Sequence, residues 1–202
     1  MKKKNLSGII AIGIVIFLSS CGKSPVAEIE SANASIEKAK QAEAELYAPA
    51  KFAALQDSLK VALVMVETQN NKKLKKYADA KEKLQEVVSL SDSVIAKSQR
   101  NKEIMKKDIQ TLLADVKALL EENKQLITQA PKGKEGTAAL AEIKVEIEMV
   151  EKSINETSEM FNKGEVIATL DKAKAAKNKA ASINTELKDV IARYNQKSGK
   201  KG

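Results

Sequence analysis

The spacing of apolar residues predicts helices over almost the whole chain after residue 25. Apolar positions recur three and four residues apart, which places them on one face of a helix. This pattern predicts helices at about 26–47, 52–70, 72–129, 137–161 and 165–196. Apolar residues at 143–149 also alternate at period two, but about 25 residues without a breaker far exceed a usual strand. We therefore predict an all-α protein.

The segment 72–129 is the longest predicted helix, and it keeps one heptad frame. Serines and a lysine dilute that frame between residues 89 and 102, so a bend or a helix end there is the alternative to one continuous helix. A free seam of this kind also favours self-association through residues 105–126, and a compact monomer is the alternative. The members of the frame are Tyr77, Leu84, Val88, Ser91, Ile95, Ser98, Lys102, Met105, Ile109, Leu112, Val116, Leu119, Asn123 and Leu126.

Helix breakers divide the chain into regions. Pro49 predicts a kink or break, with Tyr47 packed in the core beside it, and residues 130–136 contain one proline and two glycines. Gly164 follows a helix and is a natural C-cap. We predict elongated antiparallel helical hairpins in a coiled-coil-like bundle. The expected divisions are a first hairpin region at 26–129, a linker at 130–136, a second hairpin at 137–197 and a disordered tail at 198–202.

Residues 1–21 follow a different pattern. Three lysines precede an apolar run at 9–18, which is too short to span a bilayer comfortably, and then come Leu18-Ser19-Ser20-Cys21. This string resembles the bacterial lipoprotein lipobox. The resemblance implies a signal peptide at 1–20, cleavage before Cys21, a lipid on its thiol, an acylated amine, and an acylated tether at 21–25. An uncleaved signal anchor and an ordinary secreted protein are the alternatives.

The lipobox resemblance also bears on location and redox chemistry. Cys21 is the only cysteine, so it cannot form a disulfide within the chain. Gly22 follows it, and by the sorting rule of some two-membrane bacteria this residue implies the outer membrane, with the protein facing the periplasm. Exposure on the cell surface is the alternative.

A second resemblance covers residues 27–97. Ala44-Glu45-Leu46-Tyr47-Ala48-Pro49 precedes a predicted hairpin, and Lys76-Tyr77-Ala78-Asp79-Ala80 opens its second arm. These residues resemble a helical envelope-lipoprotein domain of unknown function with a Tyr-Ala-Pro element. The resemblance implies a periplasm-facing domain, and no peptidoglycan-binding module accompanies it here.

The composition argues against catalysis. Charged residues make up 31% of the chain and aromatic residues 3%, and there is no His or Trp. The chain has no Gly-x-Ser-x-Gly element and no glycine-rich phosphate loop. Glu142 and Glu146 share a helix face, but two carboxylates without a loop do not form a calcium site. We therefore predict a non-enzymatic protein with no catalytic, cofactor-binding or metal-binding residues.

Charge limits the partners. The net charge is +8, and it falls to about +5 if the three N-terminal lysines are cleaved off. We expect the lysines clustered at 72–76 and 172–179 to lie on solvated helix faces, and contact with anionic headgroups or acidic glycans is the alternative. Nucleic acid is not expected, because export and the lack of stacking aromatics argue against it.

These patterns predict a lipid-anchored periplasmic scaffold or interaction module. Its partners would be membrane lipid through acylated Cys21 and an envelope protein or anionic glycan. The alternative is a surface-exposed adhesin for acidic glycans or host ligands.

Overall fold

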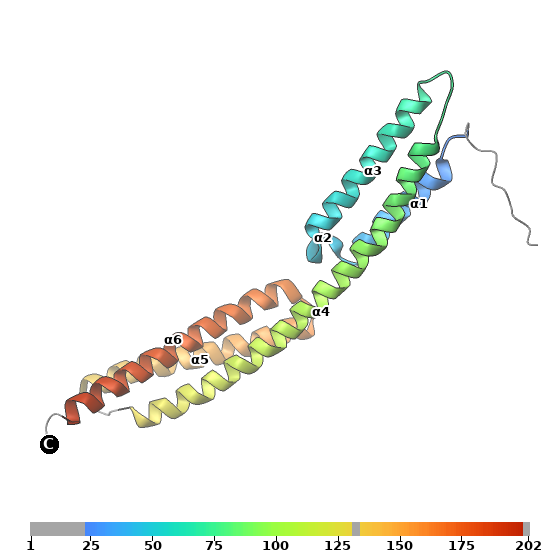
Figure 1. Cartoon of the computed structure of the whole chain (residues 1–202). Coiled ribbons are helices and arrows are strands. Elements are labelled where there is room, and N and C mark those ends of the chain that lie inside the picture. The colour runs from blue at the N-terminus through green and yellow to red at the C-terminus, as the bar shows by residue number, and fades with distance from the viewer. Residues whose placement is uncertain (1–22, 131–133, 200–202) are drawn as a thin grey trace, which may run out of the picture. The chain divides into compact units, whose positions relative to one another are not determined.

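The computed structural model describes residues 23–130 and 134–199, with side chains described from 23 to 130 and from 137 to 196 (Figure 1). The described residues contain helices and no strand, so the all-α prediction is confirmed. The helices are α1 (Val26–Gln41), α2 (Ala44–Tyr47), α3 (Pro49–Asn70), α4 (Ala78–Gln129), α5 (Lys134–Asn162) and α6 (Val166–Gly199).

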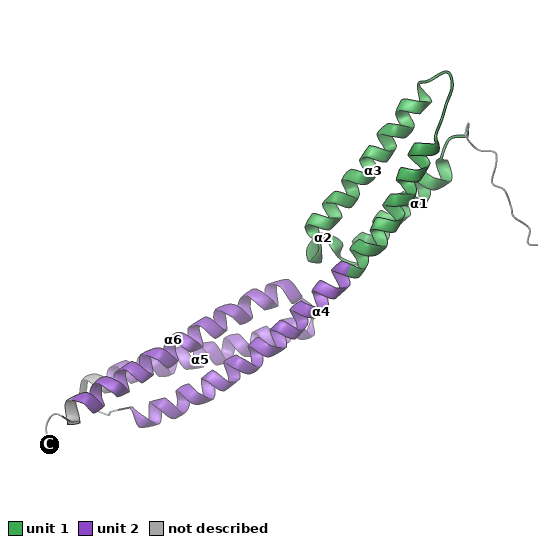
Figure 2. Cartoon of the chain, in the orientation of Figure 1, with its two compact units in different colours: residues 1–96 green, residues 97–202 purple. Residues whose placement is uncertain are grey.

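The chain forms two compact units, residues 1–96 and 97–202, and α4 contributes to both of them (Figure 2). This boundary falls inside α4 and not at the expected linker 130–136, because residues of α4 after 97 pack with α5 and α6. Helix α4 runs from Ala78 to Gln129 without interruption. The diluted part of its heptad frame is tolerated because Ser91 and Ser98 are small enough to be fully buried at the seam.

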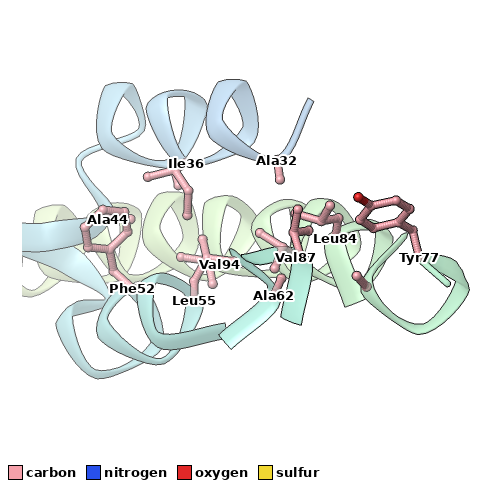
Figure 3. Close-up of a cluster of buried hydrophobic side chains, with 13 residues drawn as sticks. Ala32, Ile36, Ala44, Phe52, Leu55, Ala62, Tyr77, Leu84, Val87 and Val94 are labelled. Carbon is pink, nitrogen blue, oxygen red and sulfur yellow. The ribbon is translucent and has the colours of Figure 1, made fainter. Parts of the chain in front are cut away.

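The first unit packs α1, α3 and the first part of α4 around one core (Figure 3). Two contacts show that α1 and α4 run parallel. The Lys81 ammonium pairs with Glu28, and ten residues further along α4 the Ser91 hydroxyl donates to the carbonyl of Ser35 at 2.6 Å. The large side chains of this core include Ile36, Phe52, Leu55, Val66, Tyr77, Leu84, Val87 and Val94.

The joint before α3 differs from the single predicted helix at 26–47. Helix α1 ends at Gln41, and Glu43 takes a left-handed conformation (φ 56°) before the single turn of α2. Pro49 then occupies the first turn of α3, where its missing N–H costs nothing. Tyr47 is buried, so its predicted role in core packing is confirmed.

The second unit packs the remainder of α4 with α5 and α6. The ion pairs of Lys172 with Glu156 and of Lys179 with Glu146 show that α5 runs antiparallel to α6. The pairs of α6 lysines with Asp115 and Glu122 show that α6 runs parallel to α4, so α5 is antiparallel to both other helices. Its core is aliphatic, with no aromatic side chain. The larger members are Val116, Leu120, Leu140, Ile143, Ile147, Val150, Ile154, Ile183 and Leu187.

Helix ends in the second unit depart slightly from the predicted ones. Helix α5 begins at Lys134, inside the expected linker, and α6 extends to Gly199, inside the expected tail. The predicted C-cap is confirmed at Gly164, whose φ of 83° ends α5 while the N–H of Glu165 donates to the carbonyl of Met160. Residues 131–133 and 200–202 lie outside the described residues.

Candidate functional site

The predicted lipidation residue, Cys21, lies outside the described residues, together with the signal peptide. The described chain begins at Lys23 and enters α1 at Val26. The described residues that would lie nearest to a lipid on Cys21 are therefore the start of α1 and the residues that contact it.

The start of α1 lies beside the start of α4. The Glu28 carboxylate accepts from the Lys81 ammonium at 2.8 Å, and both side chains are about one quarter exposed. The hydrogen bond from Lys81, helped by a backbone N–H, lowers the pKa of Glu28 below its ordinary value, against the smaller opposing effect of desolvation. Because Lys81 is only in the first turn of α4, the α3–α4 connection lies at this same end of the unit (Figure 1).

The α3–α4 connection is fixed at its base. The buried Tyr77 side chain donates its hydroxyl hydrogen to Oδ1 of Asn70 at 2.5 Å. The backbone N–H of Lys76 donates to the side-chain oxygen of Gln69 at 3.3 Å. These bonds join the last turn of α3 to the residues that precede α4, so the chain between them projects as a short loop.

That loop, Lys72-Lys73-Leu74-Lys75-Lys76, is named the lysine loop below. All five of its residues are exposed, and Leu74 is 82% exposed, the highest value among the exposed large hydrophobic side chains of the described chain. The prediction that this cluster lies on a helix face is wrong, because α4 begins only at Ala78. Within the described residues, no carboxylate forms an ion pair with any of its four lysines.

The second basic cluster has a different role. Lys172 pairs with Glu156 at 2.5 Å, and Lys179 pairs with Glu146 at 2.6 Å, which joins α6 to α5. Lys177 pairs with Asp115 of α4, also at 2.6 Å. Three of the four lysines at 172–179 are therefore neutralised by the protein itself, whereas the charges of the lysine loop are available to a partner.

The described residues contain no candidate metal site. None of their acidic residues forms a cluster of three that could hold a metal ion, and Glu146, considered with Glu142 as a cation pair, binds Lys179 instead. Every buried side-chain nitrogen and oxygen in this part of the chain has a hydrogen-bond partner. The buried Asn123 and Asn184 are bonded to each other at 2.9 Å.

None of the helices in the described ranges is both long enough and apolar enough to cross a membrane.

Comparison with known proteins gives no match to a family model, a curated protein or a solved structure. The resemblances at Leu18-Ser19-Ser20-Cys21 and at residues 27–97 therefore stay predictions.

Proposed function

We propose that this protein is a non-catalytic, lipid-anchored scaffold or interaction module of the bacterial cell envelope. The observation that carries the proposal is the string Leu18-Ser19-Ser20-Cys21 directly after a basic start and an apolar run. Acyl chains on Cys21 would anchor the protein to the membrane, and two chains give stable anchoring where one gives reversible binding.

The helical units support the scaffold part of the proposal. Within the described residues, their helices carry exposed apolar side chains, and burying these against a partner would be favourable. On α3 these are Val61 and Val64, each about half exposed, and on α5 they are Val145 and Met149. An envelope protein that packs against such a helix face is the partner that we propose for these units.

The anchor is tested by metabolic labelling of cells with a clickable palmitate analogue. We expect the wild-type chain to take up the label and Cys21→Ala to take up none. Ser20→Ala is the matched control, because it keeps a small residue before the cysteine and should still be labelled. An unlabelled wild-type chain, or equal label on Cys21→Ala, refutes the lipoprotein proposal.

A surface-exposed protein that binds acidic glycans is the second candidate, and the uncompensated charge of the lysine loop favours it. Protease treatment of intact cells separates the two proposals. Degradation without permeabilisation favours the surface protein, whereas protection until the outer membrane is opened favours the periplasmic scaffold.

A further inference from the structure

The lysine loop combines two properties that suit one kind of partner. Two lysines on each side in the sequence flank a single exposed apolar residue, Leu74, in a short loop with a fixed base. Lysines are attracted to an anionic surface. An apolar side chain between them contributes favourable binding free energy only where it is removed from water. A membrane with anionic phospholipid headgroups offers both conditions at its boundary.

The covalent length of the chain limits where the loop can lie. Val26 is five residue steps after Cys21, and an extended chain spans at most about 3.5 Å per step, or roughly 17 Å in total. The ion pair between Glu28 and Lys81 places the base of the loop beside the start of α1. An anchor at Cys21 would therefore keep the loop close to the membrane surface.

We infer that the lysine loop is a second membrane contact, which binds anionic phospholipid headgroups through its lysines and inserts Leu74 at the headgroup boundary. This inference rests on the proposed lipid anchor, because the anchor brings the loop to the surface. The loop then orients the first unit on the membrane, while the acyl chains hold it there.

The fixed base of the loop supports this role. A free loop would lose conformational entropy on binding, but the bonds of Tyr77 and Lys76 to the end of α3 already limit its motion. Leu74 is held outside the core although the unit has an apolar interior a few residues away. The second basic cluster lacks these properties, because three of its four lysines bind carboxylates and no large exposed apolar side chain lies among them.

The test uses the chain from residue 21 onward with Cys21→Ser, which retains every described contact and carries no acyl chain. Its partition is measured by flotation with vesicles of one-third phosphatidylglycerol and two-thirds phosphatidylethanolamine, and with vesicles of phosphatidylcholine. We expect binding to the anionic vesicles only, and a loss of that binding as salt shortens the Debye length from about 10 Å at 0.1 M to about 3 Å at 1 M.

Variants assign the binding to the loop. Each lysine near an anionic membrane contributes about fivefold, so replacing all four loop lysines with Gln should weaken partition by roughly a hundredfold or more. Leu74→Ser should weaken it about fivefold to tenfold. The matched control also removes four charges but at exposed helix positions away from the loop, and it should lower partition less than threefold. The control substitutions are Lys51→Gln, Lys60→Gln, Lys107→Gln and Lys117→Gln.

Two results would overturn the inference. One is equal partition of the loop variant and the control variant, which would show that net charge alone drives binding. The other is equal binding of the parent chain to anionic and neutral vesicles. Either result would leave the palmitate labelling of Cys21 unaffected, so failure of the loop contact is distinguishable from failure of the anchor. Unchanged binding by Leu74→Ser would refute the insertion of that side chain.

Discussion

The polar contact inside the second core should be necessary for the stability of that unit. Asn123 is fully buried; its amide donates to the carbonyl of Ala180, and its oxygen accepts from the amide of Asn184, both at 2.9 Å. Asn123→Ala removes two buried hydrogen bonds, each worth about 1 kcal/mol net. It also leaves the amide hydrogen of Asn184 without its acceptor on Asn123, at a further cost of about 1 kcal/mol or more. We expect the free energy of unfolding of the second unit to fall by about 3 kcal/mol.

A double variant separates the hydrogen bonds from simple loss of packing. Replacing both Asn123 and Asn184 with Leu removes donor and acceptor together and fills the space with apolar atoms. Such paired replacements are close to neutral or stabilising, so we expect this variant to lie within about 1 kcal/mol of the wild type. The single and double variants should therefore differ in stability by at least about 2 kcal/mol.

Hydrogen exchange followed by mass spectrometry suits this measurement, because a chain with two units need not unfold in a single transition. In Asn123→Ala, amides of α5 and α6 should exchange about a hundredfold faster, since each 1.4 kcal/mol is worth a factor of ten. Amides of α1 and α3 serve as the internal control and should not change. Exchange within fivefold of the wild type, or a double variant as unstable as the single one, would refute the reasoning.

Three further outcomes follow from single contacts. Gly164→Ala should lower the free energy of unfolding of the second unit by about 1–2 kcal/mol, measured by urea unfolding. The cause is backbone strain at a φ of 83°, because a methyl group there would meet no other atom. An unchanged stability would contradict this explanation. The pKa of Glu28 is lowered in the folded chain, so the stability from its bond to Lys81 is present above the ordinary value of 4.5 and lost as pH falls below it. Glu28→Gln should reduce the change in the free energy of unfolding as the pH falls below 4.5. The same change in the variant and the wild type would contradict a stabilising role for the Glu28–Lys81 bond. Tyr77→Phe should cost about 1 kcal/mol and speed amide exchange at the end of α3 through loss of the bond to Asn70, whereas unchanged exchange there would exclude an anchoring role for that bond.

Much of the packing could be predicted because apolar spacing is a local signal. Every member of the heptad frame of α4 is buried or partly buried, including the serines at its weakest part. Asn123 was predicted at a position of this frame, and the structure brings it into hydrogen-bond contact with Asn184 of α6. The frame missed Val87, Val94 and Leu120, since a helix between two neighbours buries a wider stripe than a single seam.

The errors arose where distant contacts decide the structure. The helix breakers at 130–136 follow the end of α4 at Gln129, but composition cannot show that residues 97–129 belong to the later unit. Lysine is a good helix former, so residues 72–76 were predicted as helix, whereas packing of Tyr77 and its bond to Asn70 favour a loop.

The candidate site could be found only in part. Both basic clusters are visible in the sequence, but they differ in ways that no local pattern reveals. Lys177 and Lys179 bind carboxylates that are 62 and 33 residues away along the chain, and only the fold shows that these charges are already compensated. The exposure of Leu74 likewise depends on where α4 begins.

Sharing α4 between the two units has a consequence for the order in which the protein matures. Because a chain is synthesised from its N-terminus, the whole first unit is available once residue 96 has emerged, so that unit can fold early. The rest of α4 then waits for its partners with Val116 and Leu120 facing water until α5 and α6 arrive. Within that interval the incomplete polypeptide exposes an apolar seam that chaperones and proteases recognise, and a premature stop near residue 130 would make this vulnerable state permanent.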